Sequence, residues 1–204
     1  MRQPRLLPLS LALSMLTSAG AGMLAAQALT APPGGGNQRS VVTQYMGMVS
    51  VTIEYNSPDV TSPAGEDRTG KIWGELVPLG IAPNQFYPRF GTAETMPWRA
   101  GANEATTITL SHDVEIEGEP LGAGTSALVL APGEDRWTVY FTRNSEAGGS
   151  FFDDPALDAL TVEVEPDKSD FFREWLTYEF DDRQLDTTRA VMHWEHMRVP
   201  FRIS

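Results

Sequence analysis

Residues 98–107 carry the side chains best suited to chemistry, where a polar turn leads into a β-type run. Trp98 offers a flat ring that stacks on a sugar or an aromatic ligand. Arg99 offers a planar fork for an anionic group, and Glu104 can accept a hydrogen bond or act as a base. We predict a ligand-binding set of Trp98, Arg99, Asn103 and Glu104. The alternative is a ligand-free loop with an Arg99–Glu104 ion pair, Asn103 as a turn cap and a buried Trp98.

The three histidines are the other candidate chemical groups. His193 and Glu195 share one face of a strand, whereas His196 points to the opposite face unless a bulge intervenes. Zinc takes three or four converging ligands, so we predict no metal site and no cofactor. His112 has the parity of the apolar residues before it. This predicts a partly buried histidine at a strand end, with a general base as the alternative.

Hydrolase signatures are incomplete in this chain. The run at 124–128 lacks the final glycine of the serine nucleophile elbow. The absence of cysteine excludes thiol catalysis. Ser111, His112 and Asp113 are consecutive, and consecutive strand residues face opposite sides, so we predict no triad among them. A hydrolase with Glu104 or His112 as general base, or a paired-carboxylate glycosidase, is the enzymatic alternative.

Alternating apolar and polar residues predict the elements that position these groups. The period of two recurs at 49–55, 106–110, 137–142, 160–164, 176–180 and 190–194. Turn residues separate these segments, and helix signals are limited to single turns at 156–159 and 169–173. The pattern predicts an all-β fold, a single antiparallel β-sandwich or jelly-roll-like domain, with long loops at 59–70 and 78–97. Trp137 and Trp194 are predicted core residues, and Trp175 has the opposite parity to its apolar neighbours.

The first residues predict export. Arg2 and Arg5 precede an apolar run at 6–16 that is too short to span a bilayer, and Ala26-Gln27-Ala28 fits a cleavage site. We predict a signal peptide at 1–28, a Pro/Gly-rich linker at 29–39, and a β-sandwich domain at 40–204. The expected location is the periplasm or the extracellular space, and an uncleaved anchor is the alternative.

The chain is acidic and free of cysteine, with 27 acidic and 15 basic residues and a net charge of −12 at pH 7. Such a surface repels phosphate backbones and anionic headgroups. We expect no nucleic-acid partner and no stable membrane insertion after signal cleavage. Without disulfides, packing must supply the stability of an exported domain.

Several blocks have a familiar order: VTIEYNSP at 51–58, KIWGELVPLG at 71–80, WRAGANEATT at 98–107, LGAGTS at 121–126, EWLTYEF at 174–180, WE at 194–195 and VPFRI at 199–203. Together they resemble the domain-of-unknown-function family 2911, over essentially the whole mature chain. The resemblance implies a secreted or periplasmic β-sandwich and supplies no catalytic residue. Residues 81–97 resemble an insertion relative to the family, and His112, His193 and His196 stand where relatives are expected to carry basic residues.

These features favour a non-catalytic exported module that binds a small molecule, a glycan or an envelope partner through residues 78–104. The hydrolase described above is one alternative. A structural envelope or assembly protein without a small ligand is the other.

Overall fold

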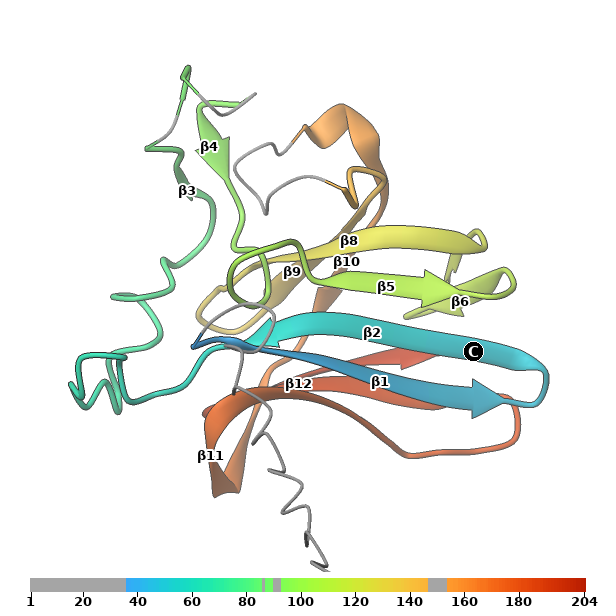
Figure 1. The fold of residues 1–204 in the computed structure, drawn as a ribbon. Coiled ribbons are helices and arrows are strands. Elements are labelled where there is room, and N and C mark those ends of the chain that lie inside the picture. Colours follow the sequence, from blue (N-terminus) through green and yellow to red (C-terminus); the bar gives the residue numbers. More distant parts are fainter. Residues whose placement is uncertain (1–35, 86, 90–92, 147–153) are drawn as a thin grey trace, which may run out of the picture. The chain divides into compact units, whose positions relative to one another are not determined.

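In the computed structural model, which describes residues 36–85, 87–89, 93–146 and 154–204, two antiparallel sheets pack against each other (Figure 1). The larger sheet has six strands in the order β1-β2-β5-β8-β9-β10. Its strands are β1 (Gln38–Met46), β2 (Val49–Ser57), β5 (Thr107–Leu110), β8 (Gly124–Ala131), β9 (Trp137–Thr142) and β10 (Asp158–Val164).

The smaller sheet has four strands in the order β11-β12-β6-β7. A long hairpin of β11 (Asp167–Asp181) and β12 (Thr188–Ile203) forms most of it, with β6 (Val114–Ile116) and β7 (Glu119–Leu121) at the other edge. The two-residue strands β3 (Ala82–Pro83) and β4 (Thr95–Met96) pair only with each other. They belong to the segment between β2 and β5, which runs along one end of the sandwich (Figure 1).

The core lies between the two sheets and follows from the alternation in the sequence. Ile53, Ile108 and Val139 of the larger sheet are fully buried, as is Leu176 of the smaller one. Burying each such side chain stabilises the fold by about 1.5–3 kcal/mol relative to exposure. Ring contacts join the sheets directly, since the Phe141 and Phe201 centroids are 5.8 Å apart. The predicted all-β antiparallel sandwich is therefore confirmed.

Local differences from the predicted elements have physical reasons. The single helical turn predicted at 169–173 is wrong, because these residues belong to β11, where pairing with β12 overrides the local signal. The turn predicted at 156–159 is a 3₁₀ turn, η2 (Pro155–Leu157), and the Asp154 carboxylate caps it by accepting from the N–H of Ala156. The first strand begins at Gln38, two residues before the predicted domain.

The predicted signal peptide at 1–28 lies outside the described residues, as do the first seven residues of the predicted linker. Within the described ranges, no helix has the length and apolar character needed to cross a bilayer.

Candidate functional site

A cluster of four tryptophans closes one end of the core. The Trp73 ring lies edge-on to Trp137, Trp194 and Trp98, with centroid distances of 4.8, 5.7 and 5.7 Å. Trp98 stacks on Trp194 with an interplanar angle of 17° and a centroid distance of 6.2 Å. Trp137 and Trp194 are buried as predicted, whereas Trp73 and Trp98 are half-buried. Trp98 therefore packs against the Trp73 and Trp194 rings of the core and remains partly exposed.

Main-chain hydrogen bonds attach Trp98 to the larger sheet. Its N–H donates to the carbonyl of Leu130 and its carbonyl accepts from the N–H of Leu130, both at 2.7 Å. This bridge joins Trp98 to Leu130, near the C-terminal end of β8. Pairing with a strand of the sheet therefore fixes the main chain that carries the ring.

The turn after Trp98 is fixed from inside the protein. Ala100 and Asn103 both adopt left-handed backbone conformations, with φ of 56° and 58°. The buried carbonyl of Ala100 accepts hydrogen bonds from the Tyr178 hydroxyl at 2.9 Å and the Thr106 hydroxyl at 3.1 Å. Burial raises the pKa of Tyr178 well above its ordinary value, so the hydroxyl stays protonated and donates.

Gly101 occupies a position where a side chain has no room. A Cβ atom there would lie 2.7 Å from the Thr106 hydroxyl oxygen and 3.0 Å from the main-chain carbonyl oxygen of Asn56. The same Asn56 carbonyl accepts from the N–H of Ala102 at 3.1 Å. The turn therefore packs directly on the end of β2, which gives the polar block a rigid base.

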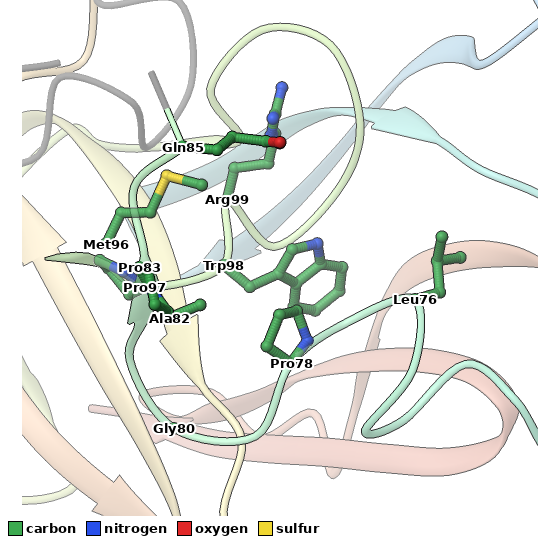
Figure 2. Close-up of a pocket in the computed structure, with 10 residues that line it drawn as sticks. All are labelled: Leu76, Pro78, Gly80, Ala82, Pro83, Gln85, Met96, Pro97, Trp98 and Arg99. Atoms are coloured by element: carbon green, nitrogen blue, oxygen red, sulfur yellow. The ribbon is translucent and has the colours of Figure 1, made fainter. Parts of the chain in front are cut away.

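Trp98 and Arg99 line a cavity of about 290 Å³, which we call the apolar cavity. Figure 2 shows the side chains of Gln85 and Arg99 on one side of it and the Trp98 ring beside Pro78. The rest of its lining is apolar or glycine: Leu76, Gly80, Ala82, Pro83, Met96 and Pro97. Among the described residues of the lining, the Gln85 and Arg99 side chains thus place polar groups at one end of a largely apolar space.

Trp98, Arg99 and Leu76 also line a second cavity of about 370 Å³, the polar cavity. Asn37, Asp59, Arg68 and Asn103 contribute its polar side chains. Two of these groups are held by the protein itself. The Arg68 guanidinium donates to main-chain carbonyls at 2.8 and 3.0 Å, and the Asn103 amide oxygen accepts from Asn37 at 3.1 Å.

Arg99 joins the two cavities. Its guanidinium donates to the main-chain carbonyl of Asn103 at 2.7 Å, which orients the group. Burial lowers the pKa of Arg99 from its ordinary value, although a guanidinium remains charged at neutral pH. A cation held in a partly dehydrated site can bind a carboxylate or phosphate through charge-assisted hydrogen bonds.

The structure brings three of the four predicted residues together and places Glu104 elsewhere. The Glu104 carboxylate accepts from the Asn56 amide at 2.9 Å and lines a different cavity of about 290 Å³, together with Arg39 and Glu54. The left-handed conformation of Asn103 precedes this change of direction. Trp98, Arg99 and Asn103 thus line one cavity, and Glu104 lines another.

His112 does not complete a catalytic group. The prediction that it is partly buried is wrong, because β5 ends two residues earlier and His112 lies exposed in the following bend. Because Ser111 and His112 lie in a bend, their side chains need not face opposite sides as they would in a strand. The Ser111 hydroxyl lies 2.8 Å from the His112 Nδ1. Asp113 accepts from a main-chain N–H across the next hairpin, at 2.7 Å. Strand β5 separates His112 from Glu104, so these two candidate bases do not meet.

His193, Glu195 and His196 each bond a different main-chain group and do not point toward a common position. His193 is buried with its Nε2 3.1 Å from the Phe171 carbonyl, and desolvation lowers its pKa. Glu195 has a positive φ of 53° and accepts from the N–H of Gly70 at 2.5 Å. His196 is exposed, with its Nδ1 2.9 Å from a main-chain carbonyl. Throughout the described ranges, no three His, Asp or Glu side chains are arranged to hold a metal ion.

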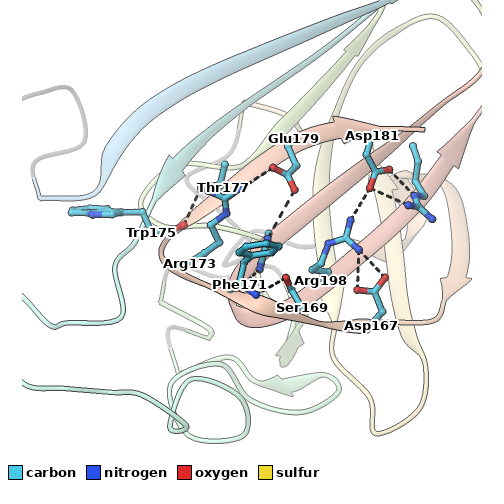
Figure 3. A network of polar contacts seen from close by, with 11 residues as sticks. Asp167, Ser169, Phe171, Arg173, Trp175, Thr177, Glu179, Asp181 and Arg198 are labelled. Carbon is cyan, nitrogen blue, oxygen red and sulfur yellow. Dashed lines mark hydrogen bonds and ion pairs between the residues drawn. The ribbon is translucent and has the colours of Figure 1, made fainter. Parts of the chain in front are cut away.

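The β11–β12 hairpin carries an ion network whose charges satisfy one another (Figure 3). Arg198 bridges Asp167 and Asp181, with N–O distances of 3.1 and 2.7 Å. Arg189 also donates to Asp181 at 2.7 Å and holds the pKa of that carboxyl below its ordinary value. Arg173 pairs with Glu179 at 3.3 Å. These contacts favour a structural role for the network.

Sequence reasoning predicted only part of the apolar walls of the cavities. Pro83 and Met96 lie within the predicted range 78–104, whereas Leu76 precedes that range and Trp194 comes from β12. The long aromatic and proline-rich loop was a signal for part of this wall. No local pattern links Trp194 to Trp98, since they are far apart in sequence.

Comparison with known proteins identifies a family. Residues 37–203 match the family model described as "Protein of unknown function (DUF2911)". No curated protein and no solved structure matches the chain.

Proposed function

We propose a binding function for this chain, which belongs to the DUF2911 family of proteins of unknown function. The protein acts as an exported, non-catalytic module that holds a small amphipathic ligand at Trp98. The observation that carries this proposal is the rigid Trp98–Arg99 pair, which lines an apolar cavity and an adjoining polar one. Export rests on the signal-peptide pattern of residues 1–28.

The lining of the apolar cavity favours a ligand with an apolar body and a carboxylate. Leu76, Met96 and the prolines offer contacts to a short chain or a ring, and Trp98 offers a flat face. Gln85 and Arg99 supply the donors at one end, where a carboxylate would be recognised (Figure 2). A sugar would instead need polar partners around its whole ring. This distribution supports a small organic acid over a glycan.

The described lining of the apolar cavity supports a non-catalytic role. Among the residues that the structure describes there, none is an aspartate, glutamate or histidine. Asp59 is the acidic residue of the polar cavity, and it lies 3.7 Å from the Arg68 guanidinium. Glu104, the predicted base, lines another cavity.

Calorimetric titration tests this proposal with benzoate and octanoate, each compared with its matched alcohol. The acids bind more tightly than the alcohols, because a charge-assisted hydrogen bond contributes about 1.5–3 kcal/mol. Arg99→Gln weakens acid binding by roughly tenfold or more and leaves the alcohols unchanged. Arg136→Gln is the matched control, because it removes the same charge from an exposed ion pair with Glu165.

Three results would overturn the proposal. Equal affinity of Arg99→Gln and the unaltered protein for the acids would show that Arg99 does not bind the carboxylate. Saturable binding of an oligosaccharide in the same titration, with the acids inert, would replace the ligand class with a glycan. A protein inert to every probe would favour the structural role.

A further inference from the structure

Strand β1 is an edge strand without the usual protection against pairing. It pairs with β2 over all nine residues with no register shift, and within the described part of the chain no strand pairs with its other side. It has no proline and no lysine, and its one charged residue, Arg39, is paired with Glu54. An edge of this kind presents main-chain N–H and carbonyl groups as a template for another strand.

The three other edges of the two packed sheets carry the protection that β1 lacks. Strand β10 contains Asp158 and Glu163 and has a register shift. Strand β7 is three residues long and contains Pro120. Strand β11 is rich in charge and has two register shifts, and part of its free edge is already bonded to the chain at 58–60. The contrast singles out β1.

The same strand exposes large apolar side chains. Val41 is 60% exposed, Tyr45 is 65% exposed, and Met48 in the adjoining turn is 86% exposed. Val41 and Tyr45 face away from the core, because their neighbours in register are Glu54 and Ser50 rather than the buried residues of β2. Exposed apolar surface next to an open sheet edge is typical of an interaction surface.

We propose that two copies of this protein pair through β1 in antiparallel orientation, joining two six-stranded sheets into one. The charge pattern favours a second copy. The chain carries a net charge of −12, yet residues 38–48 contain no acidic residue, so two acidic molecules approach along this segment with the least repulsion. The proposal does not depend on the ligand site at Trp98.

The sequence of β1 also suits pairing with itself. Full overlap of the nine residues places Val42 on the twofold axis. Val41 then faces Thr43 of the second copy on the outer side of the sheet, and Arg39 faces Tyr45. Arginine over a tyrosine ring adds a favourable cation–π contact.

Light scattering coupled to size exclusion tests the dimer, with the protein at micromolar concentrations. The unaltered protein elutes with twice the mass of one chain, and the double variant Val41→Lys, Tyr45→Lys elutes as a monomer. Both side chains are exposed, so the variant keeps its fold, which circular dichroism checks. A monomeric unaltered protein, or a dimer that the double variant retains, would overturn the proposal.

A single cysteine tests the register, because the chain has none of its own. Residues opposite each other in an antiparallel pair have Cα atoms about 4.5–5.5 Å apart, within the range of a disulfide. Val42→Cys therefore forms a disulfide-linked dimer under mild oxidation. Thr161→Cys on the other edge of the same sheet is the control and stays monomeric. Equal cross-linking of the two variants would contradict pairing through β1.

Discussion

The two hydroxyl groups that bind the Ala100 carbonyl provide a quantitative test of how the Trp98 turn is held. Tyr178→Phe and Thr106→Val each remove one hydrogen bond and leave the carbonyl with the other donor. Each single change should lower the free energy of unfolding by about 1 kcal/mol, the usual net value of a hydrogen bond. The double variant leaves a buried carbonyl with neither donor, which costs about 1–3 kcal/mol of desolvation. The two changes should therefore be more than additive, by roughly 1 kcal/mol.

Urea unfolding measures this double-mutant cycle. In a thermal scan, each single variant should melt about 2–4 °C below the unaltered protein for a domain of this size. The native state is otherwise undisturbed, since phenylalanine and valine keep the shape of the residues that they replace. Strict additivity of the two changes would refute the reasoning, because it would mean that the Ala100 carbonyl does not depend on these two donors.

Two further predictions concern the same domain. Gly101→Ala should destabilise it by about 1–3 kcal/mol, because the new Cβ would lie 3.0 Å from the Asn56 carbonyl oxygen. Gly122→Ala is the control, since the atom nearest to its new Cβ is 3.8 Å away, and it should be nearly neutral in the same urea titration. Desolvation lowers the pKa of His193, so below its ordinary value of 6.5 the unfolded chain takes up a proton that the folded chain refuses. The stability of the unaltered protein relative to His193→Gln should therefore decrease as the pH falls from about 7.5 to 5, and a constant difference would contradict this cause.

The strands that can be predicted from the sequence are those with one face buried and the other exposed, because their residues alternate between apolar and polar. Strand β9 alternates in burial along most of its length, and the sequence shows the same alternation. In β8, by contrast, the last six residues are all buried, so no period of two marks them. The bulges of β11 had no local signal either, because they arise from its pairing with β12.

Residue types predict part of the grouping of the candidate site but not its geometry. Trp98, Arg99 and Asn103, whose side chains suit ligand binding, line one cavity. Glu104 was grouped with them by sequence proximity, yet a left-handed Asn103 precedes it and its side chain bonds Asn56 instead. Non-glycine residues with positive φ are rare, so a pattern in sequence does not reveal them. The cavity walls depend on contacts between segments that are distant in sequence.

The measurement that tests the central claim most directly is an NMR titration of the five tryptophan indole N–H signals with benzoate. If the ligand site is the cavity beside Trp98, the Trp98 signal should shift saturably, followed by smaller shifts of Trp73 and Trp194, which touch its ring. Trp175, which is 37% exposed on β11, is the internal control and should not move. Shifts confined to Trp175, or a bound ligand that leaves the Trp98 signal in place, would contradict the assignment of this site.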